Sequence, residues 1–351
     1  MDSLTQIALG GAVGYAVLGS KIGRKAIIWG AALGTLPDLD VFLPYAGEVE
    51  AFTYHRGFSH SLLVHLLASP IIVWLILKVH THTTAYKKGW FWLVFLSLST
   101  HAILDSCTVY GTQLLWPLTG YPFGISNLFI IDPLYTLPLL FGLAVAAMPQ
   151  ISETRKDRAA RMNTLGLIIS SVYIAWSLAA KVYIDNKVEA AFVQQNISTT
   201  SYISTPAPFT TLLWRIVAMS NNQYYEGYAS VFDTPSEVTF TPFVTNPSLL
   251  KGIEDEWGVQ RLRLFTKGFY AIEQRNNNIV LADLRMGAKC AYVFNFVVGE
   301  FINGSVLAGN YEKVSQRSDL GAIGNIWHRI WDPSVSLSPI LEDSKCPTTL
   351  P

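Results

Sequence analysis

Residues 26–44 read AIIWGAALGTLPDLDVFLP, an apolar run that a proline and two carboxylates interrupt. The interruption is Pro37-Asp38-Leu39-Asp40, and the later polar stretch Tyr54-His55-Arg56-Gly57-Phe58-Ser59-His60 again precedes an apolar run. Ionisable groups at membrane depth are energetically expensive, so they indicate function by default. The question for the rest of the sequence is whether its fold brings these ionisable residues together in one functional site.

The composition is that of a chain with a large membrane part. Half of the 351 residues are hydrophobic and only 14% are charged, a balance that is rare in soluble domains. Nearly all the long apolar runs lie in residues 1–184, whereas residues 185–351 resemble ordinary soluble sequence. We therefore expect a polytopic α-helical membrane domain at 1–184, followed by a soluble, β-rich α+β domain at 185–351.

Six apolar segments stand out in the first half. They are residues 4–19, 26–44, 61–79, 89–106, 128–148 and 164–184. At a rise of ~1.5 Å per residue, most come close to the ~20 residues that cross ~30 Å of hydrocarbon. The first segment contains Gly10, Gly11 and Gly14, which suit close helix packing in lipid. The prediction is about six spanning helices, the second of them broken at Pro37.

Basic residues are distributed unevenly between the loops of this half. They occur in alternate loops as Lys21, Arg24 and Lys25, then Lys78, Lys87 and Lys88, then Arg155, Lys156, Arg158 and Arg161. The other loops, near 45–60 and 107–127, hold only Arg56. Because cytoplasmic loops carry the excess of lysine and arginine, both the N-terminus and the C-terminal domain are expected outside the cytoplasm.

The second half shows the alternation of β-strands. Strands are expected at 224–232, 261–265, 269–273, 278–284 and 290–298, with a helix near 247–256. In an extracytoplasmic domain, Cys290 and Cys346 could pair as a disulfide. The formal net charge is zero and no basic stripe stands outside short loops, so nucleic-acid binding is not indicated.

Two pairs of polar residues have the spacing of metal ligands. His101 and Asp105 are four residues apart, so on a helix their side chains share one face and can reach a single ion. Asp38 and Asp40 are two apart and would diverge on a continuous helix, but a break at Pro37 could turn both towards one cavity. The predicted topology brings these residues and the loop histidines to the outer end of the bundle. The predicted metal ligands are Asp38, Asp40, His55, His60, His101 and Asp105.

Mixed histidine and carboxylate ligands suit zinc, manganese or iron better than calcium, and they leave room for one or two ions. We take zinc as the first choice, with metal-activated water as the nucleophile of a hydrolysis. The predicted catalytic residues are Asp40, Arg56 and Asp132. Asp40 would be a general base and Arg56 would bind an anionic substrate such as a phosphoester. Asp132, which precedes Pro133, could instead cap a helix, as Ser59 could cap the helix after His60.

Several motifs taken together resemble one protein family. They are Asp2-Ser3-Leu4-Thr5-Gln6, Pro37-Asp38-Leu39-Asp40, His55-Arg56-Gly57-Phe58-Ser59-His60-Ser61, His101-Ala102-Ile103-Leu104-Asp105, Tyr110-Gly111-Thr112-Gln113 and Ile131-Asp132-Pro133. In combination they resemble the LexA-regulated, membrane-bound metal-dependent hydrolase family of bacterial inner membranes. The resemblance covers roughly residues 1–140. It implies a multi-pass inner-membrane hydrolase that uses a divalent metal held by the aspartates and histidines named above.

Three functions are compatible with this pattern. The first is a metal-dependent hydrolase acting on a lipid-derived or other anionic substrate at the extracytoplasmic face. The second is a cation or proton transporter that uses the same aspartates and histidines. The third is a non-catalytic membrane scaffold. Membrane lipids and a lipid-derived or small anionic substrate are the expected partners. The scaffold would bind a further partner through its β-rich domain, and the sequence does not identify any protein partner.

Overall fold

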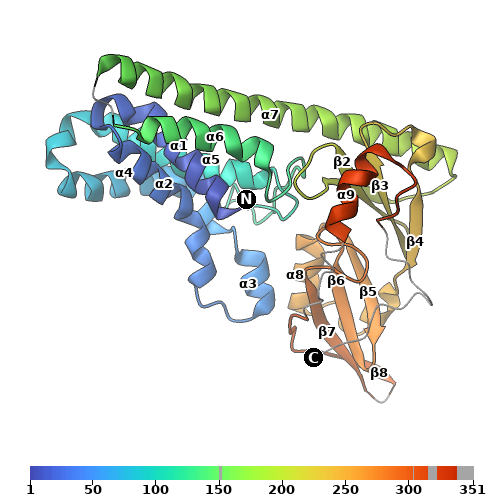
Figure 1. Ribbon diagram of the computed structural model, residues 1–351. Helices are drawn as coiled ribbons and strands as arrows, with labels where there is room; N and C mark the ends of the chain where they lie inside the picture. Colours follow the sequence, from blue (N-terminus) through green and yellow to red (C-terminus); the bar gives the residue numbers. More distant parts are fainter. Residues whose placement is uncertain (150–151, 303, 315–321, 338–351) are drawn as a thin grey trace. The chain divides into compact units, whose positions relative to one another are not determined.

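The computed structural model describes residues 1–149, 152–302, 304–314 and 322–337 (Figure 1). The chain divides into two compact units. The helical unit consists of Met1–Pro44 and Tyr54–Leu178, and the β unit consists of Tyr45–Thr53 and Ala179–Pro351. One long helix, α7 (Glu153–Gln194), runs from the first unit into the second. The sequence had suggested a change of character at 184/185.

Each of the six apolar segments contributes a helix. The helical unit contains α1 (Ser3–Ile22), α2 (Lys25–Thr35), η1 (Pro37–Phe42), η2 (Phe58–His60), α4 (Leu62–Val79), η3 (Thr81–Tyr86), α5 (Lys87–Ser106) and α6 (Pro133–Ala147). The elements labelled η are short 3₁₀-helices. Asp2 caps α1 by accepting a hydrogen bond from Thr5 N at 3.0 Å. Ser61 caps α4, so the prediction that Ser59 caps this helix is wrong.

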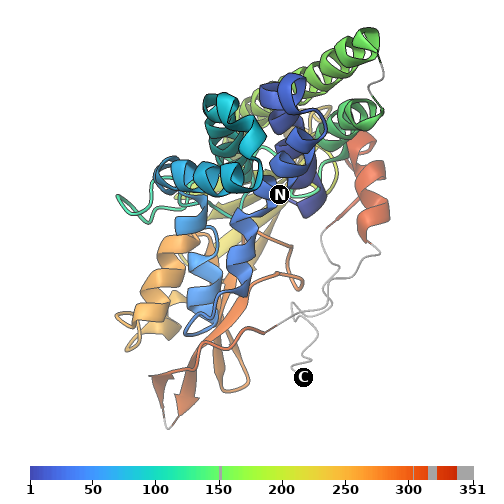
Figure 2. The ribbon, with the colours of Figure 1, turned by 90° about the vertical axis from the view of Figure 1, so that its left-hand side faces the viewer.

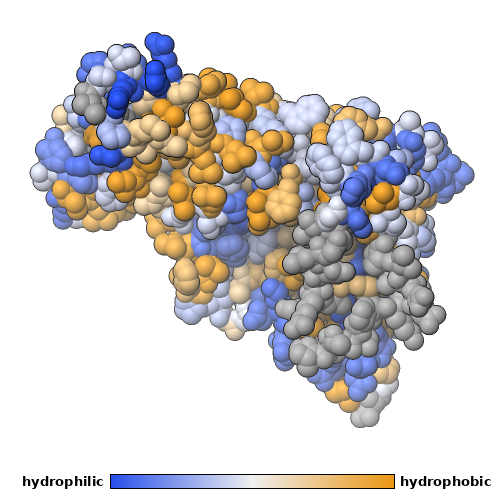
Figure 3. Space-filling model, viewed as in Figure 1, coloured by the Kyte–Doolittle hydropathy of each residue, from blue (hydrophilic) through white to orange (hydrophobic). Residues whose placement is uncertain are grey.

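The predicted fold class, with about six spanning helices, is wrong. Among the described residues, two helices are long and apolar enough to cross a membrane, α4 and α7. The 11 residues of α2 reach only ~16 Å and the 15 of α6 ~22 Å. Polar residues and glycines lower the mean hydropathy of α1. The charged residues Lys87, Lys88 and Asp105 lower that of α5. In Figure 3, hydrophobic residues gather over the helical unit, whereas the N-terminal end of α7 is hydrophilic.

Glycines set the distance between α1 and α2. A Cβ atom on Gly10 would collide with the Gly30 carbonyl and lie 2.9 Å from the Gly34 Cα atom. A Cβ on Gly14 would likewise lie 2.9 Å from the Gly30 Cα atom. The two backbones therefore touch directly, as the glycines of the first segment predicted. This contact buries much of α1 inside the protein and leaves it little surface for lipid.

The break in the second apolar segment is present. Helix α2 ends at Thr35, and Pro37 occupies the start of η1. Proline lacks an N–H group and clashes with the carbonyl four residues earlier, so it ends an α-helix while fitting the first turn of a new one. The break leaves carbonyl oxygens at the end of α2 without helical partners. One of them, Gly34 O, becomes part of the site described below.

The β unit holds two antiparallel four-stranded sheets. The first is β1 (Ser201–Pro206), β2 (Leu213–Met219), β3 (Gln223–Ser230) and β4 (Phe240–Val244), and the second is β5 (Tyr270–Arg275), β6 (Asn278–Asp283), β7 (Asn295–Ile302) and β8 (Ser305–Ala308). In both sheets the spatial order follows the sequence. The remaining elements are α3 (Glu48–Tyr54), η4 (Pro235–Glu237), η5 (Pro247–Leu250), α8 (Trp257–Phe265) and α9 (Ala322–Trp331). The expected β-rich C-terminal half is confirmed.

Two local predictions in this half are wrong. Residues 261–265 belong to α8 instead of a strand, and Val259, Leu262 and Phe265 of this helix are buried at helical spacing. An alternation of five residues is too short to distinguish the two periods. The helix expected at 247–256 is only the short η5. The predicted pairing of Cys290 with Cys346 falls on residue 346, which lies outside the described residues.

Helix α3 joins the β unit although its neighbours in sequence belong to the helical unit. Figure 2 shows it beside α8, and the Phe52 ring lies 4.8 Å from that of Phe265 and 4.4 Å from that of Phe294. Arg261 donates hydrogen bonds to Thr53 Oγ1 at 3.0 Å and to Thr53 O at 3.1 Å. The loop between Asp40 and His55 is therefore anchored in the β unit.

Candidate metal centre

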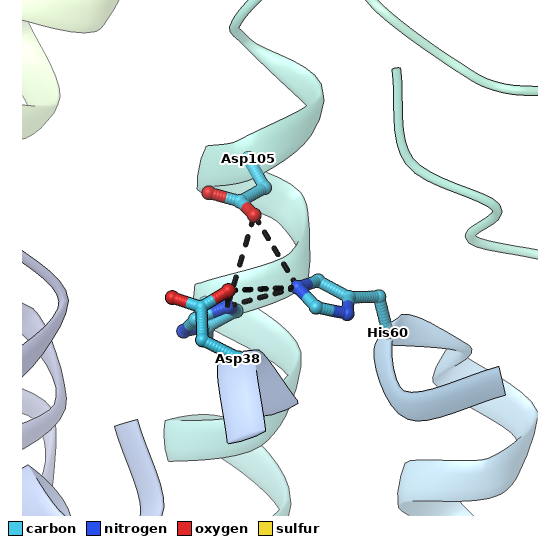
Figure 4. A group of neighbouring side chains, drawn as sticks. Asp38, His60 and Asp105 are labelled. Atoms are coloured by element: carbon cyan, nitrogen blue, oxygen red, sulfur yellow. Dashed lines mark hydrogen bonds and ion pairs between the residues drawn. The ribbon is translucent and has the colours of Figure 1, made fainter. Parts of the chain in front are cut away.

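Four of the predicted ligands meet at one point of the helical unit. Asp38 comes from η1 and His60 from η2, while His101 and Asp105 come from successive turns of α5. One ligand atom from each lies within 4.8 Å of the other three. Figure 4 shows Asp38, His60 and Asp105 pointing towards one another from separate segments. The i, i+4 pair on α5 contacts a single point, as its spacing predicted.

The distances between these atoms are short. Asp38 Oδ1 lies 3.4 Å from both His60 Nε2 and His101 Nε2. Asp105 Oδ2 lies 3.3 Å from His60 Nε2 and 3.7 Å from His101 Nε2. The two Nε2 atoms are 3.1 Å apart. Zinc binds nitrogen and oxygen ligands at about 2.0–2.2 Å, which sets the edges of a tetrahedron at about 3.3–3.6 Å. Five of the six distances between the four atoms, 3.1–3.7 Å, are therefore close to those around a single four-coordinate ion.

Hydrogen bonds on the far side of each ring fix its tautomer. His101 Nδ1 lies 2.6 Å from Gly34 O, and a carbonyl can only accept, so Nδ1 carries the hydrogen. His60 Nδ1 lies 2.9 Å from Ser59 Oγ, whose own hydrogen goes to Asp40 Oδ2 at 2.5 Å. His60 Nδ1 is therefore also the donor. Both Nε2 atoms therefore face the shared point. Burial lowers the pKa of His60, but the Asp105 and Asp38 carboxylates outweigh it and raise the pKa, so a proton or a metal ion can occupy this point. Imidazoles held at Nδ1 in this way are typical metal ligands.

Asp105 supplies an acceptor that hydrogen bonding leaves unused. Its Oδ1 atom accepts from Gln6 Nε2 at 2.9 Å and also contacts the Met1 ammonium group. Its Oδ2 atom is buried and accepts no hydrogen bond from any described residue. Arg56 Nε lies 2.9 Å from Oδ2 but without hydrogen-bond geometry, so this contact is an ion pair. Oδ2 therefore retains a lone pair for the shared point.

Asp40 and His55 stand beside the cluster of four atoms. Asp40 Oδ1 lies 2.7 Å from His55 Nδ1, and Oδ2 accepts from Arg56 N at 3.0 Å and from Ser59 Oγ. Burial raises the pKa of Asp40, but the hydrogen bonds with His55 and Ser59 outweigh it and hold the pKa below its ordinary value. Asp40 therefore orients His55 and, through Ser59, His60. That Asp40 and His55 bind metal stays a prediction.

Arg56 is buried and lies against Asp105, where it offsets the charge of that carboxylate. Its Nη1 group donates to Thr108 Oγ1 at 3.2 Å, and its guanidinium carbon stands 4.9 Å from the centre of the Tyr110 ring. Its backbone has a φ of 61°, a left-handed conformation that is uncommon outside glycine. The substrate-binding role predicted for Arg56 stays a prediction.

Asp132 lies outside the four-atom cluster and has a structural task. Its Oδ1 atom accepts from Leu134 N at 3.1 Å and so caps α6, while its Oδ2 atom accepts from Tyr173 Oη at 2.9 Å. This is the alternative that the sequence had left open. A catalytic role for Asp132 stays a prediction.

Sequence reasoning missed several residues that support the centre. Gln6 holds Asp105, Ser59 links Asp40 to His60, and Thr108 holds Arg56. Gln6 carried a signal, because an amide inside an apolar helix needs a polar partner. Ser59 and Thr108 carried none, since their partners are remote in sequence.

The fold and the site together define a helical unit with a buried candidate metal centre, followed by a β unit. The chain belongs to the YdjM inner membrane protein family, whose model matches residues 1–184. This membership supports a location in the bacterial inner membrane. The "Uncharacterized protein YfhP" of Bacillus subtilis (strain 168) is 28% identical over 152 residues, 41% of this chain and 46% of that protein. The chain thus matches less than half the length of that relative. No solved structure matches the chain.

Proposed function

We propose that the chain is a membrane-bound, metal-dependent hydrolase. Its substrate would be a lipid-derived or other anionic molecule, with a phosphoester as the first candidate. The observation that carries the proposal is the meeting of two imidazole nitrogens and two carboxylate oxygens at one point in the helical unit. The inner-membrane family supports a substrate drawn from the lipid phase or its surface. The resemblance to LexA-regulated hydrolases extends the proposal to expression controlled by LexA.

The four atoms are suited to bind a divalent cation. Without a metal ion, a proton on an imidazole Nε2 would have to offset the repulsion between the buried acceptors that meet at this point. A cation converts this repulsion into coordination, and a set of two imidazoles and two carboxylates favours zinc, with manganese or iron as alternatives. Asp38, His60, His101 and Asp105 would hold one ion. A second ion would need Asp40 or His55 as a ligand.

When bound, such an ion polarises a substrate oxygen and lowers the pKa of bound water, which is the chemistry of hydrolysis. The chain itself would supply proton transfer through Asp40 and His55. Because His55 Nδ1 donates to Asp40 Oδ1, its Nε2 atom is the proton-accepting nitrogen. A histidine held by a carboxylate in this way is suited to general-base catalysis. We assign that role to His55, with Asp40 as the residue that orients it.

Exposure indicates the side from which a substrate would approach. The side chains of Asp38 and His55 are 26% and 24% exposed, whereas those of His60, His101 and Asp105 are almost fully buried. Asp38 and His55 therefore lie at the mouth of the centre. Arg56 is assigned to the Asp105 carboxylate, whose orientation it would hold during turnover.

The test is hydrolysis by purified protein in nanodiscs made from bacterial lipid extract, with products identified by mass spectrometry. Wild-type protein loaded with zinc should release product, and chelator should abolish the release. The His55→Gln variant should keep its metal and lose at least 100-fold in rate, which is within the range of a general base. A lipidomic comparison of cells carrying the wild type and Asp38→Ala should show the same substrate accumulating.

Two outcomes would contradict the proposal. Hydrolysis that continues unchanged in Asp38→Ala would separate the activity from this centre. Metal flux in proteoliposomes without any hydrolysis would favour the transporter.

A further inference from the structure

The β unit exposes a continuous group of aromatic side chains. Helix α9 is amphipathic, with Ile330 and Arg329 buried, while Trp327 and Trp331 are 62% and 56% exposed. The two tryptophans are one helical turn apart, and their rings pack at 5.9 Å. The Phe232 ring, itself 57% exposed, stacks on Trp331 at 4.7 Å. We call Phe232, Trp327 and Trp331 the aromatic patch.

Polar contacts on the inner face hold α9 firmly in place. Arg329 forms a bidentate pair with Asp233, with distances of 2.7 and 3.1 Å between nitrogen and oxygen. Ser230 Oγ donates to Ile330 O at 2.7 Å. The outward orientation of Trp327 and Trp331 is therefore built into the β unit.

The aromatic patch lies beside helix α7. Lys187 of α7 donates to Ser230 O at 2.7 Å and to Val231 O at 3.1 Å, the residues just before Phe232. The same ammonium group stands 4.6 Å from the centre of the Tyr183 ring, one turn earlier on α7, and Tyr183 is 53% exposed. Tyr183 thus extends the row of exposed aromatic rings from the patch onto α7.

The position along α7 points to what covers these rings. Helix α7 is one of the two helices suited to crossing a membrane, and its apolar stretch is residues 164–184. Lys187 is three residues beyond that stretch, or ~4.5 Å along the helix axis. Tyrosine and tryptophan concentrate at this depth in membrane proteins, because their rings are apolar and their N–H and O–H groups reach the headgroups. Exposed apolar groups of this kind mark interaction surfaces.

We propose that Tyr183, Phe232, Trp327 and Trp331 form an interfacial anchor that inserts into the headgroup region of the lipid bilayer. The anchor fixes the β unit on the membrane surface next to the end of α7. The occupant is the lipid interface itself, since the rings continue the surface of a helix that enters the bilayer. This inference is independent of the proposed hydrolase activity.

The test places a nitroxide label on His328→Cys, a neighbouring exposed position that leaves both tryptophans intact. The full-length protein is reconstituted in nanodiscs of phosphatidylethanolamine and phosphatidylglycerol, and the spectrum of identically treated protein without the new cysteine is subtracted. Collisions of the label with oxygen, which concentrates in lipid, are compared with collisions with a water-soluble nickel chelate. The matched control is Ser305→Cys on β8, at the far end of the β unit from α9 (Figure 1).

The expected result is that the label at 328 favours oxygen and the label at 305 favours the nickel chelate. Adding Trp327→Ser and Trp331→Ser should return the label at 328 to the aqueous profile. A label at 328 that is as accessible to the nickel chelate as the control, with both tryptophans present, overturns the proposal. A label that neither reagent reaches also overturns it, because a protein surface and not lipid then covers the patch.

Discussion

Both units bury ionisable side chains, but their carboxylates have different kinds of partner. In the β unit, Glu226 accepts from Arg215 Nη2 at 2.5 Å, from Tyr292 Oη and from Lys289 N at 3.3 Å. Each oxygen of that carboxylate therefore faces a donor. In the helical unit, Asp38 and Asp105 direct oxygens at the Nε2 atoms of two histidines, and all four atoms meet at one point.

The difference separates a structural cluster from a binding site. A buried carboxylate whose two oxygens both meet donors needs no further ligand and serves the fold. Two carboxylates and two imidazoles that converge on one point need a proton or a metal cation between them. Glu226 thus belongs to the fold of the β unit.

The largest effect is expected from breaking the structural cluster. Glu226→Ala leaves Arg215 buried without its counter-charge, which should lower the free energy of unfolding by about 3–5 kcal/mol. Chemical denaturation of the purified protein in detergent measures this loss. The metal content of the folded fraction should not change. The matched control is Glu300→Ala on β7, an exposed position that should have little effect. Metal lost at unchanged stability would contradict the separation of the two clusters.

A smaller effect is expected from loosening the binding site. Ser59→Ala removes the hydroxyl that holds His60 Nδ1, and the loss of such a partner usually lowers metal affinity by about 10–100-fold. Competition with a fluorescent zinc chelator measures the affinity. The control is Ser61→Ala, two residues away, which removes the cap of α4 and should lower stability by about 1 kcal/mol without changing zinc affinity. Equal zinc affinities in the two variants would remove Ser59 from the site.

The smallest effect is expected from Asp38→Asn in the presence of chelator. Without metal, Asp38 Oδ1 still lies 3.4 Å from the imidazoles of His60 and His101, but its side chain is 26% exposed, so replacing the carboxylate with an amide should lower the free energy of unfolding by about 1 kcal/mol or less. Denaturation with chelator present measures this change. A loss as large as that of Glu226→Ala would mean that Asp38 is a structural residue.

The helices could be predicted from the sequence, but the number that span the membrane could not. Each apolar segment gives a helix, because apolar runs of this kind fold as helices in a packed core as well as in lipid. The glycine contacts that draw α1 onto α2 and the end of α2 at Thr35 decide which surfaces remain for lipid. The length of an apolar segment predicts neither the contact between α1 and α2 nor the end of α2. The five-residue alternation in α8 failed for a similar reason, since the burial of Val259, Leu262 and Phe265 at helical spacing depends on tertiary packing.

The site was partly predictable for reasons of geometry. The spacing of His101 and Asp105, one helical turn, predicted that both side chains lie on one face of a helix. Pro37 predicted the break in the second apolar segment, and the structure contains it. The direction in which each carboxylate leaves η1 could not be predicted. Asp38 points to the shared point, whereas Asp40 turns to His55 and Ser59. Neither the support of Gln6 for Asp105 nor that of Thr108 for Arg56 follows from local spacing, because both depend on how helices pack.

The metal content of the purified protein tests the central claim most directly. After equilibration with zinc and removal of excess, elemental analysis should find at least one divalent ion per wild-type chain. The Asp38→Ala/His101→Ala double variant should fold and hold none. Folded wild-type protein that retains no metal, or a double variant that retains as much as the wild type, would contradict the account.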